Sequence, residues 1–145
     1  MSRTSQTMVA AVALCAGSAG FLAAQGTPRP KLVTPIYGEA RIEITKPVTK
    51  VLGKEIVTTI YVKNVETTPI AGLIVDQYWY DTAGTPLGAD RYRHPRPLQP
   101  GEVILVTIRT AREPKMSRNK LGFTHAHGAI KQKMVPKLEV PKPAP

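Results

Sequence analysis

The sequence predicts an all-β fold, a single β-sandwich domain of about six to eight strands with extended Pro-rich ends. The chain has 145 residues, 42% of them hydrophobic, which suits one domain core but not two. Between residues 36 and 135, no stretch repeats apolar residues at helical spacing. Short runs of β-branched and apolar residues alternate with turn residues instead, which is typical of a sandwich.

The first predicted strands alternate apolar and polar residues. Ile42 and Ile44 alternate with polar neighbours before Pro47, which lacks a backbone donor and ends the run. The next run, from Ile56 to Val65, places four residues on one face, namely Ile56, Thr58, Ile60 and Val62. We expect this face of each strand to pack against the opposite sheet.

The longest run, from Ile70 to Asp81, is expected to supply the centre of the core. Leu73, Val75 and Trp79 fall on one of its faces. The other face carries Ile74, Asp76, Tyr78 and Tyr80. Gln77 interrupts the apolar face, which indicates a β-bulge or a strand that leaves the centre of the sheet. Trp79, the only tryptophan, is the expected centre of the core.

Turn signals separate the later strands. Asp81–Gly84 matches a type I turn, with Asp at the first position and Gly at the fourth. Gln99–Glu102 contains Pro-Gly and is a second strong turn. The remaining predicted strands are Val103–Thr110, Leu121–His127 and Ala129–Val135.

The start of the chain has the layout of a secretory signal peptide. Arg3 precedes an apolar run from Met8 to Gly17, and small residues follow up to Ala24. We expect a signal peptide over residues 1–26, a Pro-rich linker over 27–35, the β-sandwich over 36–135 and a Pro-rich disordered tail over 136–145. The mature protein is then exported, periplasmic or secreted, and has no transmembrane helix after processing.

Two other interpretations of this leader stay open. The first is an uncleaved membrane anchor, although the stretch from Met8 to Ala24 spans only about 17 residues and contains Gly and Ser interruptions. The second is a lipoprotein acylated at Cys15, the only cysteine, although Leu14 stands where a small residue is needed. If the leader is removed, no disulfide can form within the mature chain.

Part of the chain resembles a family of small bacterial envelope domains, often called FxLYD-like. The matching residues are Ile60–Asn64, Pro69–Ile70, Tyr78–Asp81, Gly84, Leu87 and Leu98–Glu102. The family pattern is a spaced series of Asn, Pro-Ile or Pro-Val, aromatic-Tyr-Asp, Gly and Leu-x-Pro-Gly-Glu. The resemblance implies an immunoglobulin-like β-sandwich of unknown function with no catalytic residues. The chain departs from the pattern at Trp79, where the family has Phe, and in its basic segment Arg91–Arg96.

The histidines offer the one metal-ligand pattern. His125 and His127 are two residues apart, so on a strand they point to one face. A tight site needs further ligands, and nothing in the sequence places His94 near the pair. A metal-binding or hydrolytic envelope protein using His125 and His127 is therefore the alternative function. No nucleophile motif accompanies the acidic residues Asp76, Asp81, Asp90 and Glu102. We expect no enzyme, no cofactor and no metal.

Charge is the more informative property. The net charge is +10, and without Arg3 nineteen Lys and Arg stand against ten acidic residues, a net of +9. From Arg109 to Pro145 there are nine basic and two acidic residues. The residues expected to bind an anionic surface are Arg91, Arg93, Arg96, Arg109, Arg112, Lys115, Arg118 and Lys120. Because loops gather at the two ends of a sandwich, these residues could form one patch at an end, but the sequence alone leaves their convergence open.

These observations predict a non-enzymatic exported interaction module of the cell envelope. Its basic face would bind a partner protein or an anionic surface, such as lipid headgroups or lipopolysaccharide. Arg91, Tyr92 and Arg93 interleave an aromatic ring with guanidinium groups, as single-strand nucleic-acid binders do. Export argues against nucleic acid as the partner. A solvated basic surface without a specific partner is the plainest alternative.

Processing is directly testable. The apolar stretch has signal-peptide proportions, so the mature N-terminus is expected between Ala24 and Thr27. N-terminal sequencing of the exported protein measures this. A protein that keeps Met1 or Ser2 and stays in the cytoplasm would contradict the predicted compartment.

Overall fold

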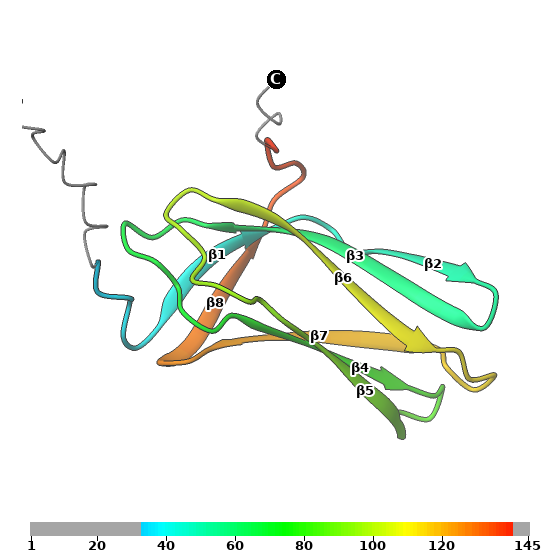
Figure 1. Cartoon of the computed structure of the whole chain (residues 1–145). Helices are drawn as coiled ribbons and strands as arrows, with labels where there is room; N and C mark the ends of the chain where they lie inside the picture. Colours follow the sequence, from blue (N-terminus) through cyan, green and yellow to red (C-terminus); the bar gives the residue numbers. More distant parts are fainter. Residues whose placement is uncertain (1–32, 141–145) are drawn as a thin grey trace, which may run out of the picture. The chain divides into compact units, whose positions relative to one another are not determined.

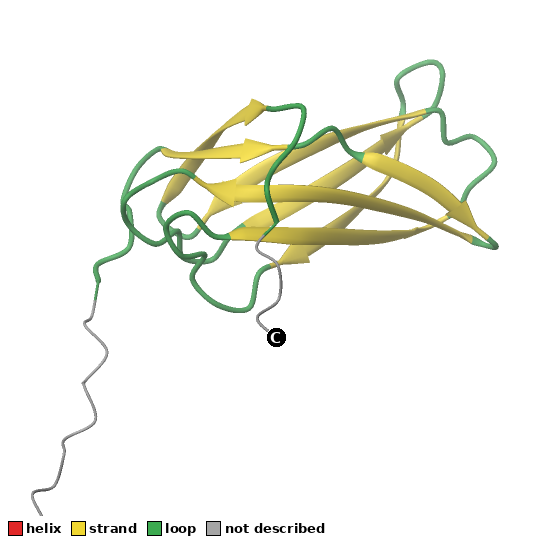
Figure 2. Ribbon diagram, turned by 90° about the horizontal axis from the view of Figure 1, so that it is seen from above, coloured by secondary structure: helices red, strands yellow, loops and turns green. Residues whose placement is uncertain are grey.

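The computed structural model describes residues 33–140, and the expected signal peptide and most of the expected linker lie outside them. Within this range every regular element is a strand, and loops connect the strands (Figures 1 and 2). The strands are β1 (Ala40–Ile44), β2 (Val48–Leu52), β3 (Glu55–Asn64), β4 (Ile74–Tyr80), β5 (Pro86–Arg93), β6 (Val103–Ala111), β7 (Arg118–His125) and β8 (Gly128–Met134). The all-β prediction is confirmed, and eight strands is the upper end of the expected number.

The strands form one mixed sheet that curls on itself. Its order is β2-β3-β1-β8-β7-β4-β5, with β6 paired to the other edge of β3. The curl brings β2, β3 and β6 across from β4, β5 and β7 (Figure 1). Neighbours are antiparallel except β1 and β8, which run parallel. The interior between the two sets of strands holds the core.

β1 and β2 lie one after the other along the same edge of β3. β1 pairs with the end of β3, from Val62 to Asn64, and β2 pairs with its beginning, from Glu55 to Thr59. The break falls at residues 45–47, and Pro47 cannot donate a ladder hydrogen bond there. The expected end of the first run near Pro47 is therefore where the edge breaks.

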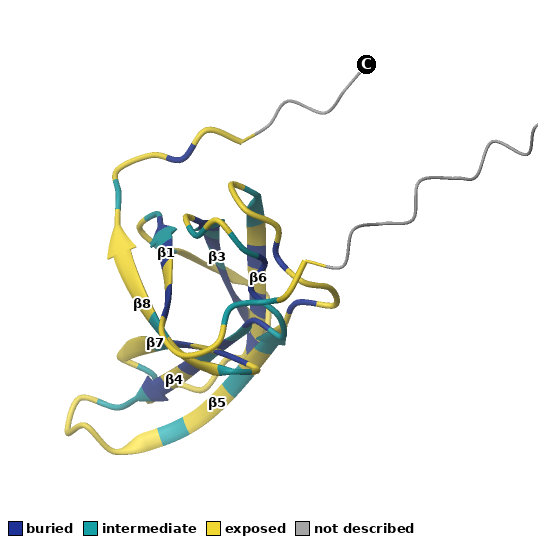
Figure 3. Ribbon diagram, turned by 90° about the vertical axis from the view of Figure 1, so that its left-hand side faces the viewer, coloured by how far each residue is buried: buried dark blue, intermediate teal, exposed yellow. Residues whose placement is uncertain are grey.

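β8 begins beside β7 and then leaves it. Only Ala129 and Gly128 pair with β7, after which the strand pairs in parallel with β1 from Ala40–Ile130 to Ile44–Met134. Glycine at position 128 allows the chain to pass from β7 to β1, because a Cβ there would lie 2.1 Å from the carbonyl oxygen of Gly38. Most of β8 is exposed (Figure 3).

The core is aliphatic, and its centre differs from the prediction. The cluster is built around Ile60, Ile70, Leu73, Val75 and Val106, all of them nearly inaccessible to solvent. Trp79 is buried, at 5% exposure, but it does not belong to this cluster. It lies near the end of β4, beyond Gln77 on the inward face. The expectation that Trp79 is the centre of the core is therefore wrong.

Gln77 is fully buried rather than displaced from the sheet. Its side-chain amide donates a hydrogen bond of 2.9 Å to the hydroxyl of Thr58. The register shift in β4 occurs between Trp79 and Tyr80, in the pairing with β5, and not at Gln77. A polar pair between facing strands thus separates Trp79 from the aliphatic cluster.

Two further segments differ from the prediction. The strand expected from Ile70 begins at Ile74, and Ile70 instead makes an isolated bridge to Leu98. The Pro-rich segment after Val135 was expected to lie outside the core, yet Leu138 is buried, at 7% exposure. The chain reaches this point alongside β1, since the Val135 N–H donates to the Ile44 carbonyl at 2.8 Å.

Replacing Trp79 tests its contribution outside the main cluster. Trp79→Ala should lower the free energy of unfolding by about 3–5 kcal/mol, the range for deleting a buried aromatic side chain. Trp79→Phe is the control, because it keeps much of the apolar contact and should cost clearly less. Urea denaturation measures both. A loss below about 1 kcal/mol in Trp79→Ala would contradict a structural role for the indole.

Candidate functional site

The eight basic residues singled out in the sequence do not form one end patch. Arg96 lies in the loop before β6, whereas Arg112 and Lys115 lie in the loop after it. β6 has nine residues, so these loops are separated by about 30 Å. Arg112 lies beside the β2–β3 turn, where its N–H donates to the Lys54 carbonyl at 2.8 Å. The basic residues therefore do not converge at one end, because the full length of β6 lies between the two loops.

Four of the basic residues are in strands rather than in loops. Arg91 and Arg93 belong to β5, and Arg118 and Lys120 belong to β7. Both strands pair with β4, one on each edge. The sequence placed Arg91 and Arg93 in a loop because the segment Pro86–Arg93 shows no apolar alternation. The other two were placed in a loop because the next strand was expected to begin at Leu121, whereas β7 begins at Arg118. The topology therefore brings them to one sheet.

Ion pairs neutralise three of the eight. The Arg91 Nε lies 2.6 Å from Asp76 Oδ1, and the Arg109 Nη1 lies 3.1 Å from Glu55 Oε2. The third pair joins the Arg96 guanidinium to the Glu102 carboxylate. The hydrogen bond and charge of Asp76 raise the pKa of Arg91. These three arginines are therefore poor candidates for an external anion.

The outer face of β5, β4 and β7 keeps cations that have no such partner. Arg93, Arg118 and Lys120 form no ion pair with the acidic side chains of residues 33–140. On β4 between them lie Tyr78, which is 40% exposed, and the partly exposed Tyr80. Register places Lys120 opposite Tyr78 and Arg118 opposite Tyr80. We call these five residues the tyrosine–cation face.

Two shallow depressions lie on this face and share Tyr80 and Lys120. One, of about 270 Å³, is also lined by Tyr78 and Gly122. The other, of about 310 Å³, extends over Arg118 toward the turn at Gly84. The sequence prediction named the cations of this face but not the two tyrosines, although the alternation from Ile70 to Asp81 already placed both tyrosines on the outward face.

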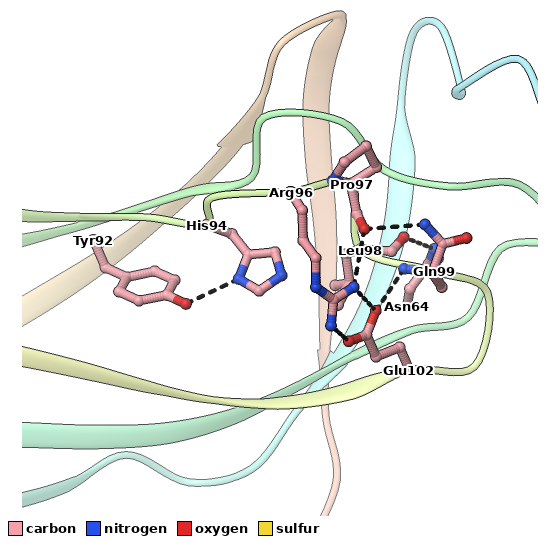
Figure 4. Close-up of polar contacts among 8 residues, drawn as sticks. All are labelled: Asn64, Tyr92, His94, Arg96, Pro97, Leu98, Gln99 and Glu102. Carbon is pink, nitrogen blue, oxygen red and sulfur yellow. Dashed lines mark hydrogen bonds and ion pairs between the residues drawn. The ribbon is translucent and has the colours of Figure 1, made fainter.

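A second polar cluster lies at the loop between β5 and β6 (Figure 4). The Tyr92 hydroxyl and His94 Nδ1 are 2.9 Å apart, and Tyr92 packs against the core. Glu102 accepts a hydrogen bond of 2.8 Å from the Gln99 N–H and also pairs with Arg96. In the segment Arg91–Arg93, the Tyr92 ring therefore points toward the core, whereas the two arginines lie on the opposite face of β5.

His94 is the most unusual group of this cluster. It is 9% exposed, and its Nε2 has no hydrogen-bond partner among the described residues. Burial, reinforced by the positive charge of Arg96, lowers the pKa of His94. The pKa of Glu102 is also lowered, chiefly by its hydrogen bond from Arg96. The folded domain therefore keeps His94 neutral beside a charged pair.

The histidine pair that offered a weak alternative as a metal site makes contacts within the fold. His125 Nε2 lies 2.7 Å from the carbonyl oxygen of Gly38, and the ring of His127 stacks on Tyr37 at 4.2 Å. β7 ends at His125, so His127 lies outside the strand. In the part of the chain that the structure describes, no three His, Cys, Asp or Glu residues are grouped as metal ligands would be.

The acidic residues considered for hydrolysis also have local partners. Asp81 Oδ1 accepts a hydrogen bond of 2.8 Å from the Thr85 N–H, which lowers the pKa of Asp81 and closes the turn after β4. Asp76 and Glu102 are held by arginines.

Comparison with known proteins adds little to this description. The chain matches no protein-family model, and no curated protein sequence matches it. A solved structure of IrmA from Escherichia coli is similar with a TM-score of 0.44 and 9% identity, over 72% of this chain and 99% of that one. Between residues 33 and 140, no helix is long and apolar enough to span a membrane.

The buried His94 predicts a dependence of stability on pH. The pKa of His94 is lowered in the folded state. Below about pH 6.5, His94 therefore binds a proton in the unfolded chain more readily than in the folded domain. The free energy of unfolding should therefore be highest above that pH and decrease on acidification toward pH 5.

His94→Gln should flatten this decrease in urea denaturation between pH 8 and 5. The variant and the parent should still lose stability together at lower pH, where Glu66, Glu102 and Asp81 become protonated. Equal slopes above pH 5 would contradict the role of His94.

Proposed function

We propose that this chain is a non-enzymatic, exported interaction module of the cell envelope that binds an anionic surface through its tyrosine–cation face. The observation that carries the proposal is the grouping of Arg93, Arg118 and Lys120 on one side of a single sheet without acidic partners from residues 33–140. Anionic lipid headgroups and lipopolysaccharide are the surfaces that fit the expected compartment. A partner protein with an acidic surface would use the same residues.

Electrostatics supports this assignment. The whole chain has a net charge of +10, so its field attracts polyanions from a distance. Cations that share one face of a sheet can approach an anionic surface together, and each contributes about 1 kcal/mol near a charged membrane. The two tyrosines add amphipathic side chains, each with an apolar ring and a polar hydroxyl, which suit the boundary between water and a lipid layer.

We propose also that the curled sheet is an immunoglobulin-like sandwich of the FxLYD-like kind. The burial alternation on β3, β4 and β6 supports this, because each strand presents one face to a shared interior. So do the turn residues that the resemblance rests on. Asn64 and Glu102 both hold the Leu98–Glu102 turn in place.

The roles of the polar residues support a binding module over an enzyme. Asp76, Asp81 and Glu102 hold ion pairs and turns, and His125 holds the segment before β1. Export rests on the leader over residues 1–26.

A charge-reversal experiment tests the proposal. The purified mature protein should bind anionic vesicles or lipopolysaccharide, and binding should weaken steeply as salt rises, since exposed charges are screened over about 10 Å at 0.1 M. The triple variant Arg93→Glu, Arg118→Glu, Lys120→Glu should bind at least about 100-fold more weakly. Arg91 and Arg96 are left intact, because reversing them would set carboxylates against Asp76 and Glu102.

The control carries the same change in net charge elsewhere. Lys50→Glu, Lys54→Glu, Arg112→Glu alters exposed cations on β2, on its turn and after β6. It should lose much less affinity, and both variants should melt near the parent temperature because exposed charges contribute little to folding. Equal losses would assign binding to net charge alone. Absence of binding to every polyanion at low salt would leave a basic surface without a partner.

A further inference from the structure

The two depressions on the tyrosine–cation face join into one open groove. They meet at Tyr80 and Lys120, which line both. We call the joined feature the Tyr80 groove, lined by Tyr78, Tyr80, Gly84, Arg118, Lys120 and Gly122. Each half, about 270 and 310 Å³, is near the lower limit for small-ligand pockets. A groove this shallow contacts one side of a ligand and leaves the other in solvent.

Gly122 keeps the groove open. It lies in β7 opposite Asp76, on the same outward face as Lys120. A Cβ at this position would stand 3.7 Å from Tyr78 Cε2, which is ordinary contact, and the glycine does not have a left-handed backbone. Neither conformation nor space therefore requires glycine, which weakens a strand relative to larger residues. Its effect is to leave the edge of the Tyr78 ring uncovered.

The chemistry of the lining selects a ligand with two properties. Tyrosine rings offer flat apolar faces with a hydroxyl at one end, so the ligand needs flat apolar faces of its own. On the neighbouring strand, Lys120 and Arg118 lie directly opposite the two tyrosines. Their side chains bind carboxylates or phosphates. Among chains of the expected envelope compartment, acidic polysaccharides combine sugar rings with regularly spaced anions.

We propose that the Tyr80 groove binds an acidic polysaccharide, with sugar rings lying on Tyr78 and Tyr80 and acidic groups on Lys120 and Arg118. This inference rests on the proposed function, because it names the anionic material that the tyrosine–cation face recognises. It differs from the proposed function in one respect. Binding to a charged surface needs the cations alone, whereas binding to a polysaccharide also needs the two rings and the open position at Gly122.

The experiment separates charge from ring recognition with four soluble probes. Polygalacturonate carries rings and carboxylates, inorganic polyphosphate carries charge without rings, dextran carries rings without charge, and single-stranded oligothymidylate carries bases and phosphates. The mature protein should bind polygalacturonate more tightly than polyphosphate of equal charge. It should not bind dextran measurably.

The variants remove the rings while the charge stays constant. Tyr78→Ser, Tyr80→Ser should weaken polygalacturonate binding about tenfold and leave polyphosphate binding within about twofold. Gly122→Val should act in the same direction by covering the Tyr78 ring, and its β-branched side chain suits a strand, so it tests the groove even if the double variant fails to fold. Tyr37→Ser is the matched control, since Tyr37 is 67% exposed and lies before β1.

The outcomes distinguish the two proposals. Equal losses of polygalacturonate and polyphosphate binding would overturn polysaccharide recognition while the anionic-surface function stands. The same holds if neither the double tyrosine variant nor Gly122→Val loses affinity for polygalacturonate. Tighter, tyrosine-dependent binding of oligothymidylate would also overturn it and assign the groove to nucleic acid. If neither polyanion nor anionic vesicles bind at low salt, both proposals fail.

Discussion

Asn64 is the residue on which the arrangement of this domain depends. It is fully buried at the end of β3, and every polar atom it has is engaged. Its backbone N–H donates to the Glu102 carbonyl, and its own carbonyl accepts from the Gly101 N–H. Its side-chain NH2 donates to the Thr68 and Leu98 carbonyls, and its Oδ1 accepts from the Glu66 N–H. One side chain therefore joins the loops before β4 and before β6 to the end of β3. An apolar residue there would leave the Thr68 carbonyl without its donor and the Glu66 N–H without its acceptor. Leaving such groups unpaired is more costly than losing one surface bond.

The candidate site follows from the opposite faces of β4. The inward face packs Val75, Gln77 and Trp79 in the interior, and this determines which residues point outward. β5 and β7 pair with the two edges of β4, so their outward residues share a surface although they are distant in sequence. The ion pair of Asp76 with Arg91 leaves the positive charge concentrated toward Arg118 and Lys120.

Sequence reasoning recovered the parts that local rules determine. Alternation identified β3, β4 and β6, and the turn chemistry of Asp81–Gly84 and Gln99–Glu102 marked two real turns. β5 was missed because Gly88 and Ala89 dilute its pattern and most of it is exposed. β2 was also missed, because it is exposed throughout and has no buried face that would give it an apolar alternation. The pairing of each arginine depends on strand register, which composition does not encode. The tyrosines of β4 were assigned to the correct face, but their meeting with Lys120 required the β4–β7 pairing.

The parallel ladder between β1 and β8 has a mechanical consequence. The chain enters β1 at the end where Gly38 meets His125 and leaves β8 at the opposite end, where Val135 meets Ile44. Tension applied between these two points would act along the strands in opposite directions. All five register pairs from Ala40–Ile130 to Ile44–Met134 would then bear the load together in shear instead of opening one at a time. A domain tethered at both of its ends would therefore resist stretching through β8, a strand that is largely exposed.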